Sequence, residues 1–502
     1  MDYSGMKALV MGLGLHGGGL ESARFMLRRG AVVTVTDTKD EKALAPSIEQ
    51  LEAACREAGQ GVSVRYVLGR HEAEDFRNAD IVIKNPGVRP DSPWLQLAKR
   101  IETDISLFLA ASPARLFAIT GTKGKSTAAS ALHWILTKAR ESKAGFAGKT
   151  GFVNKAWLGG NITVSPLSFL EELTADDDVV LELSSWQLGD LKGRTAPNGG
   201  PLLKPRAAVL TAIMPDHLDR YASMEAYTAD KRIIYSGQDR DCVTIAGDDE
   251  WGRSFLSETR GRSLVYARAP LPEGQSGGWL ADPEGPGLAR LYGDDWPGFD
   301  SRRSTGETVE LVPSRLRTPG THQKQNLLAA ALAAYGLGVE AEIIRNALAS
   351  FPGIEHRLEF FHEAGGIRFY NDSAATIPEA AAAAVQALSP GAPLALVTGG
   401  NDKNLDFSVL AEAASEARAI ILLAGSGSEK LKVLLDEAGI NYRGPFDDLD
   451  KAVNTALEIA RSETARGGCG IVALSPGCTG FGMFQNEFDR GRKWKDAVMR
   501  LA

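Results

Sequence analysis

The stretch ITGTKGKST at residues 119–127 constrains the fold of this chain more than any other. It follows the apolar run LFAI and precedes TAASALHWILTKA, which has the pattern of a buried-face helix. The Gly-Lys-Ser-Thr ending is typical of a phosphate-binding P-loop, although the usual first glycine falls on Ile119. We therefore predict a shortened phosphate loop between a buried strand and a helix, which places it in an α/β sheet.

The residue types in this loop fit phosphate chemistry. Two glycines let the backbone curl around phosphate oxygens, Lys125 supplies a mobile positive charge, and the hydroxyl of Ser126 or Thr127 can ligate Mg²⁺. The helix after the loop directs its free N–H groups at the bound anion. The expected nucleotide contacts are Gly121, Thr122, Lys123, Gly124, Lys125, Ser126 and Thr127.

The rest of the chain repeats the alternation of short β-rich runs and longer helical patterns, which is typical of parallel sheets with crossover helices. A length of 502 residues is too great for one core. We predict an α/β protein with three domains: a Rossmann-like N-terminal domain, a central P-loop domain and a Rossmann-like C-terminal domain, at residues 1–112, 113–317 and 318–502. A Gly/Pro-rich segment near 265–305 is expected to be a surface loop or hairpin insertion in the central domain.

Composition excludes several classes of protein. No apolar run approaches the roughly 18 residues needed to cross a bilayer. The net charge of −7 disfavours nucleic acid as a partner. The N-terminal run leads into a glycine-rich turn, as a first strand does and a secretory signal does not, so we expect a cytoplasmic protein. The four cysteines have no metal-binding spacing and are expected to be thiols.

A second glycine-rich turn, GLGLHGGG at residues 12–19, follows the first predicted strand. Asp37 ends the next strand, about twenty residues further on, where a dinucleotide fold would hold a ribose hydroxyl. Taken alone, this pattern suggests an NAD site. Such turns also occur for purely structural reasons, so both interpretations stay open at this point.

Three residues after the phosphate loop are candidates for metal chemistry. Glu182 lies in the apolar run VLELSSWQL and needs a partner, which is either a metal ion on nucleotide phosphates or a buried Arg or Lys. His217, between Asp216 and Asp219, is either a ligand near magnesium or a loop histidine. Lys231 has the position of an ordinary lysine on a helix surface.

The last third of the chain places four polar residues near predicted strand or helix ends. They occur in GTHQKQN, FPGIEHRLEFF, YNDSAAT and VTGGNDKN, and are Asn326, Arg357, Asp372 and Lys403. An arginine could contact phosphates and an aspartate a ribose or base. Each also has an ordinary surface interpretation when it is taken alone.

The ordered set of motifs resembles the Mur ligases. GTKGKST, GGNI, LELSSWQL, DHLDRY, ADKRIIY, GTHQKQN, HRLEFF, YNDSAAT, TGGNDKN and LSPGC occur in that order and cover essentially the whole chain outside the Gly/Pro-rich segment. The resemblance is strongest to the glutamate-adding branch of this family. It implies a UDP-sugar domain, a central ATPase domain and a C-terminal amino-acid domain, and it replaces NAD at the first turn by a UDP diphosphate and uracil.

The resemblance also implies roles for particular residues. ATP would phosphorylate the carboxylate of UDP-N-acetylmuramoyl-L-alanine, and the amine of D-glutamate would attack the acyl phosphate. Ser126, Glu182 and His217 would help to hold Mg²⁺, and Lys231 would be carbamylated and hold Mg²⁺ as an anion. Lys125, Glu182, His217 and Lys231 would form the catalytic set. The implied ATP contacts are Asn326, Arg357 and Asp372, and the implied substrate contacts are Leu15, His16, Asp37, Thr38, Asn161 and Lys403.

Two departures from the family pattern fall on the expected amino-acid pocket. Ala374 stands where a lysine is usual after YNDS, and Gly480 stands where a serine is usual after LSP-x-C. Loss of one charge-assisted contact weakens binding by about 1.5 to 3 kcal/mol unless another group replaces it. Replacement cations near this site in the sequence are Lys432, Arg490, Arg492 and Lys493.

Two alternatives to a D-glutamate ligase remain. One is a Mur-type ligase that adds a different amino acid, which the two departures favour. The other is a nucleotide-binding dehydrogenase or regulator. In the leading interpretation, the protein serves peptidoglycan precursor synthesis, and through it cell shape and division. We expect it to act on small molecules as a monomer, without nucleic acid or membrane insertion.

Overall fold

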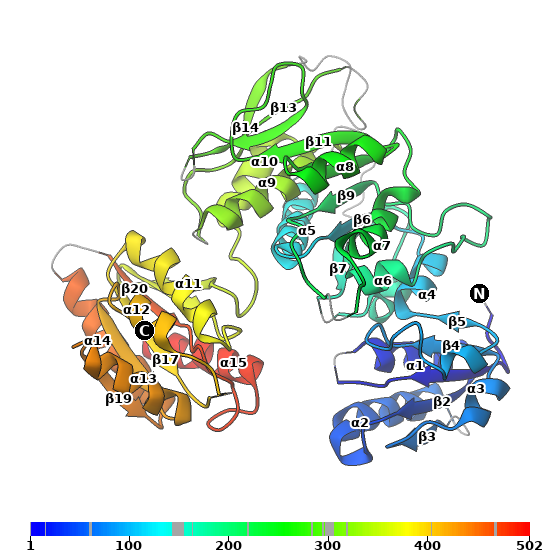
Figure 1. Ribbon diagram of the computed structural model, residues 1–502, viewed down its shortest axis with the longest axis horizontal. Coiled ribbons are helices and arrows are strands. Elements are labelled where there is room, and N and C mark those ends of the chain that lie inside the picture. Colours follow the sequence, from blue (N-terminus) through cyan, green and yellow to red (C-terminus); the bar gives the residue numbers. More distant parts are fainter. Residues whose placement is uncertain are drawn as a thin grey trace. The chain divides into compact units, whose positions relative to one another are not determined.

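The computed structural model describes residues 2–15, 17–59, 63–142, 155–162, 164–217, 220–282, 285–293, 296, 306–317, 320–402, 404–465 and 469–502. Its contacts group the chain into two compact units (Figure 1). The first unit comprises Met1–Ser314 with Lys324–Leu348, and the second comprises Arg315–Gln323 with Ala349–Ala502. The described residues form three sheets, so the predicted α/β class is confirmed.

The first sheet has five parallel strands in the order β3-β2-β1-β4-β5. The strands are β1 (Lys7–Met11), β2 (Val32–Asp37), β3 (Arg65–Leu68), β4 (Ile81–Lys84) and β5 (Ile101–Glu102). The helices that connect and follow them are α1 (Gly18–Arg28), α2 (Glu41–Ala58), α3 (Ala73–Asn78), the short η1 (Leu95–Leu97) and α4 (Asp104–Ala111). The strand order reverses between β1 and β4, where open α/β sheets bind ligands beyond the carboxyl ends of the strands.

The second sheet has nine strands in the order β14-β13-β12-β11-β10-β9-β6-β8-β7. Its parallel part contains β6 (Arg115–Thr120), β7 (Ala156–Gly160), β8 (Asp178–Glu182), β9 (Ala207–Leu210), β10 (Val243–Gly247) and β11 (Arg262–Ala267). The Gly/Pro-rich segment contributes β12 (Gly277–Leu280) and β13 (Gly287–Arg290), which pair antiparallel, followed by β14 (Thr308–Val312). The described part of the insertion is therefore a hairpin that extends the central sheet.

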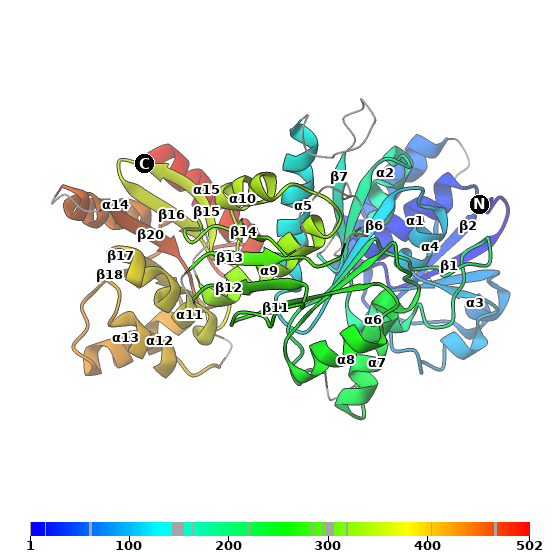
Figure 2. The same ribbon diagram turned by 90° about the horizontal axis from the view of Figure 1, so that it is seen from above.

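The helices of this region are α5 (Lys125–Glu141), α6 (Ser185–Gly189), α7 (Met224–Ser236), α8 (Glu250–Glu258), α9 (Thr321–Tyr335) and α10 (Ala341–Ser350), with η2 (Pro166–Ser168) and η3 (Leu170–Glu172). Helix α9 lies along the antiparallel extension (Figure 2). Glycines on β12 and β13 permit this packing, because side chains at Gly278 and Gly287 would press against Leu328 of α9. Contacts thus group most of α9 and most of α10 with the first unit, while the predicted boundaries at residues 112 and 317 stay predictions.

The sheet of the second unit has the order β15-β16-β20-β17-β18-β19, in which only β15 is antiparallel. Its strands are β15 (Glu359–Ala364), β16 (Ile367–Asn371), β17 (Leu394–Gly399), β18 (Ala419–Leu423), β19 (Tyr442–Phe446) and β20 (Gly470–Leu474). One face packs on α11 (Pro378–Leu388), α12 (Ser408–Ala414) and α13 (Ser426–Glu437), with the short η4 (Ser389–Gly391) after α11. The other face packs on α14 (Leu449–Thr464) and α15 (Glu487–Leu501). Alternate side chains of each strand enter these two apolar layers, as expected for a doubly covered parallel sheet.

Two expectations from composition can be checked against the described residues. None of their helices is both long enough and apolar enough to cross a membrane. All four cysteines are free thiols, as predicted.

Candidate active site

The predicted phosphate loop joins β6 to α5 and has the backbone conformation that such a loop requires. Gly121 and Gly124 have φ values of 146° and 87°, in the region that favours glycine. A Cβ on Gly121 would lie 1.9 Å from the Thr211 hydroxyl oxygen, so the loop packs directly against the end of β9. Lys125 begins α5 and donates from Nζ to the Thr122 carbonyl at 3.0 Å. The N-terminal N–H groups of α5 and this ammonium form an anion site.

Glu182 ends β8, beside the strand that carries the loop. The two strands are parallel, and Ile119 pairs with Glu182 in register. The carboxylate is 1% exposed, and its Oε1 accepts a hydrogen bond from Asn161 Nδ2 at 2.9 Å. Its Oε2 is buried and hydrogen-bonds no described residue. A buried anionic oxygen without a partner is costly, so a cation is the group that this position fits.

Lys231 lies under the phosphate loop. It comes from α7, is 1% exposed, and donates from Nζ to the Gly121 carbonyl at 2.9 Å. Burial, together with the charge of Lys125, lowers the pKa of Lys231 to about 7, while Asp216 and Asp230 oppose this shift. The solvated surface position first considered for this lysine is therefore wrong. Near neutral pH a large fraction of this amine is uncharged and nucleophilic.

Tyr227, one turn before Lys231 on α7, connects several parts of this edge. Its hydroxyl lies 3.0 Å from Thr122 Oγ1, and Lys231 Nζ lies 4.5 Å from its ring centroid. The ring centroid of His217 is 6.4 Å from that of Tyr227 and 5.0 Å from that of Trp186. His217 is exposed and has a φ of 54°. The structure brings this histidine to the loop that follows β9, next to the phosphate loop.

Asn326 of α9 also reaches the phosphate loop. A Cβ on Gly124 would lie 2.2 Å from Asn326 Oδ1, so only glycine leaves room for this amide. The loop, Glu182, His217, Lys231 and Asn326 thus meet at the carboxyl ends of β8, β6 and β9. Asn161 belongs to the same group through its bond to Glu182.

Arg357 and Asp372 lie together in the second unit. Asp372 follows β16, and its carboxylate accepts hydrogen bonds from Ser475 Oγ at 2.6 Å and from the backbone N–H of Leu358 at 3.0 Å. Burial raises the pKa of Asp372 to about 7, and the nearby charge of Arg357 partly offsets this shift. Arg357 itself is exposed between two residues of positive φ, His356 and Leu358. Their backbone conformation fixes the direction of this segment.

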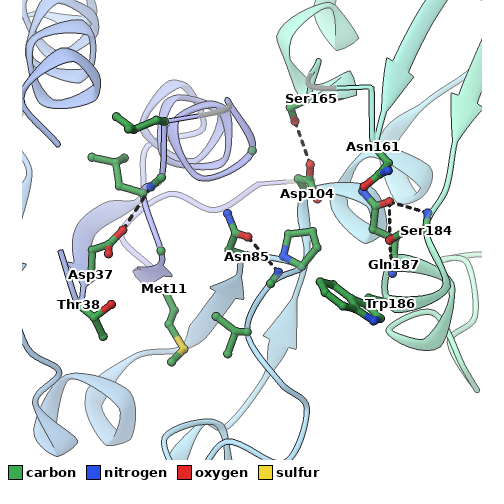
Figure 3. A pocket seen from close by; sticks show the side chains of 18 of the residues that line it. Met11, Asp37, Thr38, Asn85, Asp104, Asn161, Ser165, Ser184, Trp186 and Gln187 are labelled. Atoms are coloured by element: carbon green, nitrogen blue, oxygen red, sulfur yellow. Dashed lines mark hydrogen bonds between the residues drawn. The ribbon is translucent and has the colours of Figure 1, made fainter. Parts of the chain in front are cut away.

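A cavity of about 630 Å³ runs from the turn after β1 to the strand that carries Asn161 (Figure 3). Leu15, Asp37, Thr38 and Asn161, all predicted to bind substrate, line it. Asp37 holds the turn, because its carboxylate accepts hydrogen bonds from the N–H groups of Gly14 at 3.3 Å and Lys39 at 2.9 Å. In Figure 3, Asp37 and Thr38 lie at one end of the cavity, and Asn161 and Trp186 lie at the other.

Several lining residues were not predicted, among them His71, Asn85, Asp104 and Trp186. His71 Nδ1 lies 2.7 Å from Thr36 Oγ1, which also bonds the Arg70 carbonyl at 3.1 Å. Burial lowers the pKa of His71. Asn85 could have been found by the rule that located Glu182, because it follows a buried strand beside β1. His71 and Asp104 carry no comparable signal in the sequence.

Two predicted substrate residues, His16 and Lys403, lie outside the described residues. Ala374 and Gly480, the two departures from the family pattern, lie within the described residues. A Cβ on Gly480 would lie 2.3 Å from the carbonyl carbon of Asn486 and 2.3 Å from the backbone nitrogen of Glu487, so the chain itself fills the space of a side chain. Ala374 donates its N–H to the His356 carbonyl at 2.9 Å.

Three of the suggested replacement cations, Lys432, Arg490 and Lys493, have local partners. Arg490 is 1% exposed and donates to the carbonyls of Cys478, Thr479 and Ser373. Lys432 pairs with Glu429 at 2.9 Å, and Lys493 pairs with Asp489 at 2.9 Å. Arg490 therefore fixes the loop after β20, and the two lysines form local surface ion pairs.

Comparison with known proteins identifies relatives along the whole chain. Three family models match: "Mur ligase MurD-like, N-terminal domain" at residues 6–106, "Mur ligase middle domain" at 119–284 and "Mur ligase, glutamate ligase domain" at 356–466. A protein of Treponema pallidum (strain Nichols) named UDP-N-acetylmuramoylalanine--D-glutamate ligase is 38% identical over 550 residues, covering 98% of this chain and 97% of the relative. One of the same name from Roseiflexus sp. (strain RS-1) is 38% identical over 513 residues, covering 99% of each.

Solved structures agree in fold. UDP-N-acetylmuramate-alanine ligase MurC of Thermotoga maritima superposes with a TM-score of 0.54 at 18% identity, covering 99% of this chain and 100% of the other. MurF of Acinetobacter baumannii gives a TM-score of 0.54 at 15% identity, covering 98% and 93%. With matching family models and full-length relatives at 38% identity, the chain belongs to the Mur ligase family.

Proposed function

We propose that this protein is an ATP-dependent ligase that joins D-glutamate to UDP-N-acetylmuramoyl-L-alanine during peptidoglycan precursor synthesis. The observation that carries the proposal is the buried Glu182 carboxylate beside the phosphate loop, with one oxygen held by Asn161 and the other without a described partner. This arrangement joins the end of the substrate cavity to the nucleotide site. The names of the full-length relatives support the choice of reaction.

The cavity is suited to the UDP-sugar. The glycine turn after β1 and the start of α1 provide backbone N–H groups for a diphosphate. Asp37 and Thr38 lie at the end assigned to uridine, and Asn161 lies at the end assigned to the muramoyl arm (Figure 3). The carboxylate to be activated would thus arrive beside Glu182 and the phosphate loop.

The chemistry follows from the charges at the carboxyl ends of β6 and β8. A carboxylate is a poor electrophile, and transfer of the γ-phosphoryl group of ATP converts it into an acyl phosphate. Lys125 and the first N–H groups of α5 stabilise the charge on the moving phosphoryl group. The amine of the amino acid then attacks the acyl carbon, the tetrahedral adduct collapses to the amide, and phosphate leaves.

Glu182 and Ser126 fit a magnesium ion, since the unpartnered carboxylate oxygen needs a cation and the hydroxyl is a hard oxygen ligand. Held there, magnesium would supply positive charge that neutralises the nucleotide phosphates. Lys231 cannot serve such a site as an ammonium, but its depressed pKa suits reaction with CO₂. The resulting carbamate is an anion, and we include this modification, with His217 nearby, in the proposal.

As the resemblance to the Mur ligases implies, we also propose Arg357 and Asp372 as contacts to ATP, and Lys403 as a contact to the amino acid. ATP and UDP-sugars are found in the cytoplasm, so we propose that the reaction takes place there. We further propose that the protein acts as a monomer.

The test is phosphate release from ATP with each co-substrate omitted in turn. We expect release to require both UDP-N-acetylmuramoyl-L-alanine and an amino acid, with D-glutamate preferred over L-glutamate, D-aspartate and L-lysine. Ala374→Lys, which restores the family cation, should change the Michaelis constant for D-glutamate more than that for ATP. ATP turnover that ignores the acceptor would eliminate the proposed reaction.

The same assay addresses a ligase that adds another amino acid, which Ala374 and the filled space at Gly480 favour. A strong preference for an amino acid other than D-glutamate would mean that the protein is a ligase of this type with a different amino-acid substrate. Size-exclusion chromatography with light scattering at assay concentrations measures the oligomeric state, and a stable dimer would contradict the monomer.

A further inference from the structure

Asp104 is a buried carboxyl group that the proposed chemistry does not use. It is the first residue of α4, is 5% exposed, and lines the substrate cavity. Figure 3 shows it between the end marked by Asp37 and the end marked by Asn161. An acidic side chain at the middle of a cavity for a diphosphate needs an explanation, because two like charges repel strongly away from water.

The carboxyl group faces the start of α1. A Cβ on Gly18, the first residue of that helix, would lie 3.6 Å from Asp104 Oδ2. Gly17 caps α1 with a φ of 88° and without a side-chain hydrogen bond, so the first N–H groups of α1 have no partner within the helix. Asp104 therefore lies beside the place where this helix would bind a phosphate oxygen.

The hydrogen bonds of Asp104 leave room for one more partner. Its Oδ1 accepts from the backbone N–H of Ile105 at 2.9 Å, and its Oδ2 accepts from Ser165 Oγ at 3.2 Å. Each carboxylate oxygen can take part in about two hydrogen bonds. A proton on Oδ2 would make this oxygen a donor toward the cavity while it still accepts from the serine.

The charged groups around Asp104 do not stabilise its anion. Asp190, which follows α6, adds negative charge, and it is itself paired with Lys84 of β4 at 2.7 Å. On the other packed elements, Glu21 of α1 is paired with Arg24, and Glu102 before α4 is paired with Arg194. Burial, with a smaller contribution from Asp190, raises the pKa of Asp104 even in the absence of a ligand.

We propose that Asp104 takes up one proton from solvent when the UDP-sugar binds and, as a neutral acid, donates a hydrogen bond to a diphosphate oxygen. The proposal rests on the UDP-sugar being the substrate. It makes Asp104 a binding residue whose protonated form recognises the diphosphate, where an arginine or lysine would be the usual choice.

The direction of the pH effect follows from this coupling. The two negative charges of a bound diphosphate raise the pKa of Asp104 above its value in the free protein. Between the two values, binding takes up a proton, so affinity falls as pH rises, by at most about tenfold per pH unit. Below both values the acid is already protonated and affinity no longer depends on pH.

The test is calorimetric titration of UDP-N-acetylmuramoyl-L-alanine into the intact protein, without ATP or amino acid. The window from about pH 7 to pH 8.5 avoids ordinary histidine and aspartate titrations, and neither the diphosphate diester nor the substrate carboxylate titrates there. Repeating the titration in buffers of different ionisation enthalpy gives the number of protons taken up. We expect proton uptake on binding and an affinity that falls as pH rises within this window.

Two variants separate Asp104 from other sources of proton uptake. Asp104→Asn keeps a neutral donor at this position and should bind with little pH dependence and no uptake. Asp37→Asn removes the other acid of the cavity and should weaken binding but keep the uptake. Infrared difference spectra of the wild-type protein should show a new protonated carboxyl band on binding, which needs no variant.

Binding without proton uptake, or uptake that persists in Asp104→Asn, would overturn the proposal. If the UDP-sugar bound at no pH, and phosphate release did not require it, the proposed function itself would fail. The two failures are therefore distinguishable.

Discussion

Two glycine-rich turns in the first unit have the same local design and different surroundings. GLGLHGGG follows β1 and precedes α1, and ITGTKGKST follows β6 and precedes α5. Both use glycines of positive φ to open a helix N-terminus toward an anion. The second contains Lys123 and Lys125 and lies above Lys231, whereas the first contains no lysine or arginine.

The acidic residues beside the two turns differ as well. Beside the second turn, Glu182 presents a buried oxygen without a described partner, which suits a metal ion. Beside the first, Asp37 is occupied by the backbone of its own turn, and Asp104 is held by Ser165 and Ile105. Under the proposed function, the first turn thus holds phosphate with backbone N–H groups and without a cationic side chain of its own, whereas the lysines and the free carboxylate oxygen at the second turn suit phosphoryl transfer.

The largest expected effect is at Lys125. Lys125→Ala removes the mobile charge at the γ-phosphoryl group and should lower acceptor-dependent phosphate release by at least about 10³-fold. Lys138→Ala on the same helix, which removes a surface pair with Glu141 and a contact with the Trp134 ring, serves as the matched control. Calorimetry should find the affinity for the UDP-sugar unchanged in both variants. A parallel loss of UDP-sugar affinity would show that the two turns are not independent.

Glu182→Gln should lower phosphate release by about 10²-fold, since one charge is lost while the bond from Asn161 can be kept. The concentration of Mg²⁺ that gives half-maximal rate should rise. A magnesium titration of the rate measures both values. An unchanged magnesium requirement would remove Glu182 from the proposed metal site.

Asp37→Ala should weaken binding of the UDP-sugar by about tenfold to a hundredfold, because the Gly14 and Lys39 N–H groups lose their acceptor. The rate at saturating UDP-sugar should stay close to that of the wild-type protein. A large fall in this saturating rate would mean that the first turn does more than hold the substrate.

The smallest expected effect is the dependence of activity on carbon dioxide. Since the pKa of Lys231 is about 7, the reactive neutral amine dominates above that pH, and carbamylation should be more complete at pH 8 than at pH 6. Activity should fall several-fold in CO₂-depleted buffer and return on addition of bicarbonate. Labelled bicarbonate followed by carbon NMR should give a carbamate signal that Lys231→Arg abolishes. Full activity without CO₂ would show that Lys231 acts as a buried amine and that its carbamylation is not required.

Much of this site could be predicted from sequence, because its members follow strands. A buried strand, a glycine turn and a helix are local patterns, and their order in the sequence places Glu182 and Asn326 near element ends. The metal-binding role proposed for Lys231 could not be predicted from the local sequence pattern. Its helix looked amphipathic, and only the resemblance to the Mur ligases gave the lysine a meaning, which its 1% exposure supports.

What sequence could not provide are contacts across long separations. Thr122 meets Tyr227 over 105 positions, and Asp104 meets Ser165 over 61. No local pattern in the sequence links the two members of either pair. Their pairing depends on how parallel strands are ordered in the sheet, which short motifs do not specify.

The filled space at Gly480 restricts the mutational routes open to this protein. Serine at this position would need the backbone at Asn486 and Glu487 to move first, because a Cβ would lie 2.3 Å from it. The single substitution Gly480→Ser therefore gives a poorly packed variant. An inhibitor that relies on a serine hydroxyl at this position would find no side chain here, and substitution of Gly480 alone would not supply one without a backbone shift.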